Sequence, residues 1–161
     1  MPANDPFLPA DETARTLARD LIRDARFAAL GGLAQGAPFV TRIALVRGPD
    51  GVPLTLVSDL APHTAALRAD PRCSVLVGEP GEKGDPLTHP RLTLQARAAF
   101  VARDGAEYAA LRDHYLAQQP KAQLYIDFAD FHLVRLMPEA GHLNGGFGRA
   151  WRLTAADLGQ P

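Results

Sequence analysis

The stretch VSDLAPHTAALRADPRCSVLV, residues 57–77, contains the end of a strand, a loop, a brief helix and the start of another strand. Pro62 opens the helix, because a proline at the first helical position gives up an amide that has no intrahelical partner there. Pro71 closes the helix, and the apolar run that starts at Cys73 predicts the next strand. The stretch therefore predicts a sheet whose strands are interrupted by one short helix.

The sequence on either side of this stretch adds further strands. Residues 38–60 contain two β-rich runs around GPDG at 48–51, and the Pro-Asp-Gly chemistry of that turn predicts an antiparallel hairpin. Residues 91–102 alternate apolar and polar side chains, which predicts a long strand with one buried face. Residues 131–153 predict another strand, a turn at 138–141 and a glycine-rich exit into a last short strand.

Two longer helices accompany these strands. The spacing of apolar residues predicts an amphipathic first helix over about residues 11–30, with Asp11 as its cap and a glycine pair as its stop. A third helix is predicted where Asp104 and Glu107 have the spacing of a capping box. Because the chain lacks the regular strand–helix alternation of a parallel sheet, we expect a mainly β fold, a small antiparallel barrel with helices packed outside.

Composition narrows the class of protein. With 161 residues, 47% of them hydrophobic, and a net charge of -1, the chain is expected to form a single domain over residues 1–161. Arginine supplies 15 of the 17 basic residues, but without the basic stripe of a nucleic-acid binder, so no nucleic-acid partner is expected. The chain shows neither a basic leader with an apolar run nor a stretch of about 18 apolar residues. We therefore expect no membrane association and a cytoplasmic location.

Familiar catalytic and metal-binding motifs are not found. Cys73 is the only cysteine and is interpreted as a small core residue, and the five histidines show no H-x-x-x-H spacing, so no metal site is expected. The segment NGGFGRAW at 144–151 is not G-x-G-x-x-G, and Ser58 does not lie in G-x-S-x-G. A dinucleotide-binding fold and a serine hydrolase therefore have no support.

Arg42 is the first candidate for a binding residue. It shares a strand face with Val40 and Ala44, and a charge among apolar neighbours is costly unless a partner compensates it. A salt bridge to an acidic residue, or access to water at a strand end, would explain it, and so would an anion site. The sequence leaves these alternatives open.

The start of the helix at Pro62 is the second candidate. A helix N-terminus attracts phosphate through its free amides and its dipole. Ser58 and Thr64 add hydroxyl donors there, and His63 can add a charge-assisted donor. The alternative is that Ser58 merely ends a strand and Thr64 lies in a first turn, where both residue types are common.

Five segments, taken in order, share the pattern of one known family: PFVTRIAL (38–45), GVPLTLVSDLAPHTAALRADPRCSVLV (51–77), RLTLQARA (91–98), DFADFHLVRL (127–136) and GGFGRAW (145–151). The chain resembles the FMN-binding split-barrel proteins related to pyridoxamine 5'-phosphate oxidase and, within them, the HugZ-like branch of haem-utilisation proteins. The resemblance runs from about Phe27 to Leu153. It implies an antiparallel, Greek-key-like split barrel, mainly β with flanking helices.

The resemblance also implies a homodimer with FMN in a cleft between the subunits and a small-molecule substrate. An arginine on an early strand, a strand end, the helix start and a strand of the partner would hold the cofactor, and no catalytic residue is implied. The implied cofactor-binding residues are Arg42, Ile43, Ala44, Leu45, Val57, Ser58, His63, Thr64, Arg91, Gln95 and Arg149.

The function implied first is that of an FMN-binding flavoprotein, an oxidoreductase in which the cofactor carries the chemistry. The helix start departs from the oxidase pattern, because His63 and Thr64 replace two basic residues and weaken the expected grip on phosphate. An alternative is a haem-binding protein, an enzyme or a non-catalytic carrier, with His132 or His142 as candidate iron ligand. A third alternative is an interaction domain whose cleft holds no cofactor.

Overall fold

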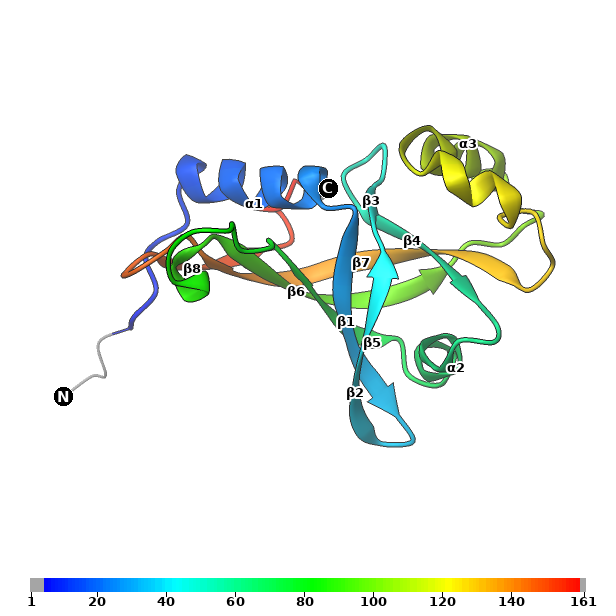
Figure 1. Cartoon of the computed structure of the whole chain (residues 1–161), viewed down its shortest axis with the longest axis horizontal. Coiled ribbons are helices and arrows are strands. Elements are labelled where there is room, and N and C mark those ends of the chain that lie inside the picture. The colour runs from blue at the N-terminus through cyan, green and yellow to red at the C-terminus, as the bar shows by residue number, and fades with distance from the viewer. Residues whose placement is uncertain (1–4, 160–161) are drawn as a thin grey trace.

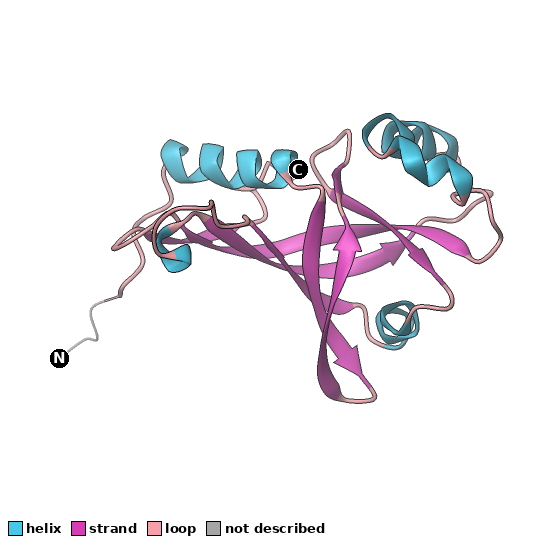
Figure 2. Ribbon diagram, in the orientation of Figure 1, coloured by secondary structure: helices cyan, strands magenta, loops and turns pink. Residues whose placement is uncertain are grey.

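One antiparallel sheet of eight strands forms the frame of the protein in this computed structural model, which describes residues 5–159 (Figures 1 and 2). The strands are β1 (Phe27–Ala34), β2 (Ala37–Ala44), β3 (Val46–Arg47), β4 (Pro53–Ser58), β5 (Arg72–Val77), β6 (Arg91–Phe100), β7 (Phe131–Asn144) and β8 (Ala150–Thr154). Their hydrogen-bonded order is β2-β1-β5-β6-β7-β4-β3, and β8 pairs with β7 outside this path. The mainly β fold with flanking helices that the sequence predicted is confirmed.

Three α-helices lie around this sheet: α1 (Glu12–Asp24), α2 (Pro62–Ala69) and α3 (Tyr108–Gln118), with short 3-10 helices at Pro86–Thr88 and Pro120–Leu124. The Asp11 side chain accepts a hydrogen bond from the amide of Ala14, which confirms the predicted cap of α1. Pro62 stands in the first turn of α2, as predicted. Within residues 5–159, no helix is long and apolar enough to cross a membrane.

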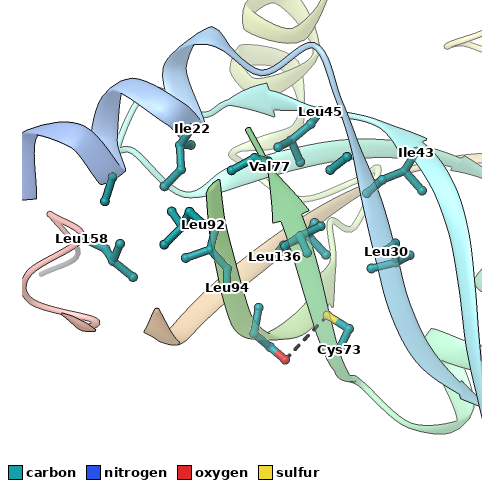
Figure 3. Packing of buried hydrophobic residues seen from close by; sticks show 14 of the residues in the cluster. Ile22, Leu30, Ile43, Leu45, Cys73, Val77, Leu92, Leu94, Leu136 and Leu158 are labelled. Atoms are coloured by element: carbon teal, nitrogen blue, oxygen red, sulfur yellow. Dashed lines mark hydrogen bonds between the residues drawn. The ribbon is translucent and has the colours of Figure 1, made fainter. Parts of the chain in front are cut away.

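The inner face of the sheet carries the larger hydrophobic cluster (Figure 3). Helix α1 contributes Ile22 to it and helix α2 contributes Leu67. From the sheet, Leu92 and Leu94 of β6 and Leu136 of β7 are fully buried in the same cluster. Each such side chain contributes about 1.5–3 kcal/mol by leaving water, so this cluster fixes α1 and α2 on the inner face.

The opposite face of the sheet, the outer face, is covered at one end only. Tyr108 and Tyr115 of α3 pack there against Leu54 of β4 and Leu133 of β7. Successive side chains of a strand point to opposite faces, so Leu133 lies on the outer face while its neighbour Val134 belongs to the inner cluster. From β2 across to β8, the outer face carries exposed or half-exposed side chains. That part of the outer face is open.

The predicted first helix is wrong at its C-terminal end. The helix was expected to reach about residue 30, but α1 ends at Asp24. Residues 27–34 form β1, which lies between β2 and β5. Buried residues alternate there, as Ala28 and Leu30 show, but the small residues on both faces of the strand hide this period in the sequence. Pairing with two strands overrides helix propensity, and the glycine pair at 31–32 lies inside β1.

Three predictions about turns and caps also differ from the structure. Only Val46–Arg47 pairs with β4 across the GPDG turn, because most of the first run forms β2 and pairs with β1. Residues 138–141 form no turn: β7 continues through them, and Glu139 is the extra residue of a β-bulge, next to a proline whose missing amide a bulge tolerates. α3 begins at Tyr108 without a side-chain cap, so the capping box at Asp104 does not form.

Candidate functional site

A row of directly paired residues crosses the open part of the outer face. In order from β2 to β8, this outer row consists of Arg42, Ala29, Leu76, Thr93, His142 and Arg152. Because neighbouring strands lie about 4.8 Å apart, the outer row is roughly 24 Å long. The sequence neighbours of its members, among them Ile43, Leu92 and Leu143, are buried in the inner cluster, which places the row on the outer face. A guanidinium group therefore stands at each end of the row.

An open groove of about 450 Å³ lies beside the outer row. Val40, Gly31, Ser74 and Gln95 line it as a second row of directly paired residues, each two positions along its strand from a member of the outer row. The side chains of Ser74 and Gln95 are polar and form no hydrogen bond with any described residue. Val40 supplies apolar surface and is 71% exposed. The groove therefore offers unsatisfied polar groups beside apolar surface, a combination typical of small-molecule sites.

Arg42 is exposed on the outer face and stacks on the ring of Phe27, with 5.3 Å from its guanidinium carbon to the ring centroid. Among residues 5–159 it has no carboxylate partner, so the salt-bridge explanation for this charge fails. It is the third-last residue of β2 and pairs with Ala29 of β1. Arg42 is thus a cation that is free to bind an anion.

The polar groups at the start of α2 are engaged within the chain. Thr64 is 1% exposed, and its hydroxyl donates to the carbonyl of Ser58 at 2.5 Å. The Ser58 hydroxyl donates to a carboxylate oxygen of Asp130 at 3.3 Å and accepts from the amide of Leu60 at 3.1 Å. These bonds connect the end of β4 to α2 and to the start of β7. Both hydroxyls therefore have a structural role, which was the alternative to phosphate binding that the sequence left open.

Two carboxylates flank the start of α2. Asp59 lies 2.9 Å from the imidazole of His132 and 3.5 Å from the guanidinium of Arg68, and the hydrogen bond from His132 lowers the pKa of Asp59. Asp130 is the second carboxylate and contacts the Ser58 hydroxyl. A phosphate bound here would meet negative charge, and the guanidinium of Arg68 and the imidazole of His132 are already engaged by Asp59.

His63 lies on the other side of the sheet from Arg42. Its ring sits against Leu30, Gly32 and Phe39, toward the inner face, where burial lowers the pKa of the imidazole. A lowered pKa favours the neutral ring, which offers no cation to a phosphate. The structure therefore separates Arg42 from the predicted helix-start donors, and the cofactor roles of all these residues stay predictions.

The other predicted residues lie in the core, at strand ends and in the loop before β8. Ile43, Leu45 and Val57 are buried in the inner cluster, so only their backbone could meet a ligand. Arg91 follows the β5–β6 loop and donates to the carbonyl of Leu87. The remaining two are Ala44, whose carbonyl accepts the hydroxyl of Thr55, and Arg149, whose guanidinium lies over the ring of Trp151.

Leu76, Thr93 and Arg152 are members of the outer row that were not predicted as site residues. A signal for Arg152 exists in the sequence, since it stands between the buried Trp151 and Leu153 in a strand-like alternation. What the sequence lacks is the strand order that brings it next to His142. Within the described chain, no group of three or more histidine, cysteine, aspartate or glutamate side chains could hold a metal ion.

An antiparallel sheet packed by helices on its inner face, with an outer face left open over much of its width, is the architecture of a split-barrel protein. Residues 15–145 match the pyridoxamine 5'-phosphate oxidase family, and the chain belongs to that family. The resemblance seen in the sequence, including that to the HugZ-like branch, is confirmed.

Three proteins illustrate this similarity in sequence or in structure. The chloroplastic heme oxygenase HOZ of Arabidopsis thaliana is 35% identical over 117 residues, which cover 73% of this chain and 35% of that protein. The heme oxygenase HutZ of Vibrio cholerae is 31% identical over 131 residues, covering 78% of this chain and 72% of that protein. A heme binding protein from Mycobacterium smegmatis is similar in structure, with a TM-score of 0.84 and 30% identity over 93% of this chain and 61% of that one. The chain thus spans about a third of the plant relative.

Proposed function

We propose that this chain binds haem on the open part of its outer face. The observation that carries the proposal is the outer row, in which apolar surface lies between arginines and beside an exposed histidine. Haem is a flat apolar macrocycle with two carboxylates and an iron that accepts an imidazole ligand. Arg42, which has no carboxylate partner among residues 5–159, offers a guanidinium group to a carboxylate, and Leu76, which is 43% exposed, offers apolar contact. Arg152 is already ion-paired with Asp5 at 3.4 Å. The names of the three relatives support the same ligand.

FMN is the second candidate, favoured by the free guanidinium of Arg42. The other residues predicted to hold its phosphate fit that group poorly. The hydroxyls of Ser58 and Thr64 are engaged, and the Asp130 carboxylate stands at the Ser58 hydroxyl. An FMN-dependent oxidoreductase acting on a small molecule therefore has less support than a haem-binding protein.

A second copy of the chain is the proposed cover of the outer face. Phe27, Val40 and Leu76 are exposed by 41%, 71% and 43% on that face, more apolar surface than isolated exposed residues would give. The homodimer implied by the family resemblance would bury them together with the ligand. Light scattering coupled to gel filtration tests the dimer with and without haem.

Titration of the purified chain with ferric haem, followed by difference absorption of the Soret band, tests the proposal directly. Saturable binding that survives gel filtration is expected, together with little change in FMN fluorescence in a parallel titration. Quenched FMN fluorescence without haem binding would reverse the order of the two candidates. Addition of a reductant and oxygen to the haem complex then separates an enzyme, which loses the Soret band and releases iron, from a carrier, which keeps both.

A further inference from the structure

One position in the floor of the groove has no side chain. Gly31 of β1 pairs with Val40 of β2 on one side and with Ser74 of β5 on the other, and all three residues line the groove. Val40 is 71% exposed and Ser74 is half-buried, so a side chain stands on each side of the glycine. The floor of the groove between them is therefore the bare backbone of β1.

The fold does not require a glycine at this position. The φ angle of Gly31 lies outside the left-handed region, and a Cβ atom there would be 3.8 Å from the carbonyl oxygen of Ser74, which is an ordinary contact. The pairing of β1 with β2 and with β5 runs through Gly31 without a register shift, so the glycine marks no bulge. Glycine loses more conformational freedom on folding than other residues do, and it weakens a strand interior. A glycine with room for a Cβ in an unbulged strand indicates that another group approaches the backbone closely.

The charged side chains of the groove are compensated within the chain. The guanidinium of Arg72 lies 2.6 Å from the carboxylate of Asp70, and the carboxylate of Glu139 lies 2.7 Å from the guanidinium of Arg97. Arg72 and Glu139 line the groove, and its other lining residues carry no charge. An ionic group of a ligand would have to compete with these ion pairs, whereas an uncharged ring would not. The groove therefore suits the uncharged body of a ligand.

We propose that Gly31 is a specificity-determining residue of this groove, and that the flat ring of the bound ligand lies against the backbone of β1 there, between Val40 and Ser74. This assignment rests on the proposed haem binding and goes further by naming the strand on which the macrocycle lies. Arg42 precedes the end of β2 two residues beyond Val40 and stays available to a haem carboxylate. A side chain at residue 31 would lift the macrocycle from the floor and remove close contacts, whose attraction falls steeply with distance.

Side chains of increasing size at residue 31 test the assignment by titration with ferric haem, followed through the Soret band. Gly31→Ala should lower haem affinity by about two- to threefold and Gly31→Val by about tenfold, because the larger side chain displaces the ring further. The unfolding temperature should stay the same or rise, since glycine is a poor residue for a strand interior. Gly32→Ala is the matched control. Its Cβ would point to the opposite face with no atom within 4 Å, so haem affinity should equal that of the wild type.

The outcomes separate a ligand contact from the other uses of a glycine. If the wild type binds haem and Gly31→Val binds it equally well, the assignment of Gly31 is overturned while haem binding stands. If the wild type fails to bind haem at all, both proposals fail together. A lower unfolding temperature in both variants would show that the fold needs this glycine and would overturn the assignment. Weaker self-association by light scattering, with unchanged haem affinity, would also overturn it and assign the close approach to a second copy of the chain.

Discussion

The start of α2 and the outer row are both rich in polar side chains, yet they use them in different ways. At the start of α2, the hydroxyls of Ser58 and Thr64 form hydrogen bonds with the backbone and with Asp130. In the outer row, Arg42 and His142 have no described partner for their charge or ring nitrogens. A polar group that is bonded within the chain adds stability to the fold, whereas an exposed one that bonds only to water is available to a ligand. Substitutions at the two regions should therefore change different measurements.

The largest effect is expected from a charge placed in the middle of the outer row. Leu76→Glu puts a carboxylate between Ala29 and Thr93, where it repels the carboxylates of haem and resists desolvation. Haem affinity should fall by about 100-fold or more, which corresponds to roughly 2.8 kcal/mol. Leu76→Met, which keeps the apolar surface, is the matched control and should bind as the wild type does. Unchanged affinity in Leu76→Glu would move the haem site away from this face.

At the start of α2, the expected loss is in stability. Thr64→Val keeps the shape of the buried side chain but removes the hydroxyl that donates to the Ser58 carbonyl. The free energy of unfolding should fall by about 1–2 kcal/mol, measured by urea denaturation, while haem affinity stays the same. Thr16→Val on the exposed face of α1 is the control and should change stability by less than about 0.5 kcal/mol. A tenfold loss of cofactor affinity with unchanged stability would instead restore this region as a cofactor site.

The same two regions show how far sequence reasoning reaches. Local signals sufficed for the elements around them: Pro62 marked the start of α2, and the alternation of residues 91–100 gave β6 and its polar face. Local signals failed at residues 27–34, where small residues fit a helix as well as a strand. Pairing with β2 and β5 makes this segment a strand. The residues at the start of α2 were identified, but whether their hydroxyls were free depended on Asp130, which is distant in sequence.

The outer row illustrates a second reason for the limit. Each of its strands shows its outward residues by alternation, so Arg42 and Gln95 could be recognised singly as facing out. Their assembly with His142 and Arg152 requires the strand order and register, which depend on long-range pairing. The β-bulge at Glu139 shifts that register between Gln95 and Ala96, and no local pattern marks it.

A smaller effect is expected at the β2 end of the outer row. Arg42→Ala removes a guanidinium that has no carboxylate partner in the described chain, so the fold should lose less than about 0.5 kcal/mol. Cofactor affinity should fall by about tenfold, roughly 1.4 kcal/mol, for haem or for FMN, whichever binds. Arg23→Ala, which removes an exposed arginine paired with Asp20 and Asp24, is the control and should leave affinity unchanged. Unchanged affinity in Arg42→Ala would show that neither ligand uses this end of the row.

The smallest effect concerns pH and the packed histidine at the start of α2, His63. Burial lowers the pKa of His63 below its ordinary value of 6.5, so the unfolded chain binds a proton there more readily than the folded chain does. The stability that neutral His63 allows is therefore fully present above the unfolded pKa and is lost as pH falls below it. Urea denaturation at pH 8 and at pH 5 should show a greater loss for the wild type than for His63→Gln, because glutamine does not titrate. Aspartates with lowered pKa, such as Asp70 at about 2, affect stability only at lower pH and leave this window to the histidines. Equal losses in the two proteins would mean that the His63 ring is as well solvated in the folded chain as in the unfolded one.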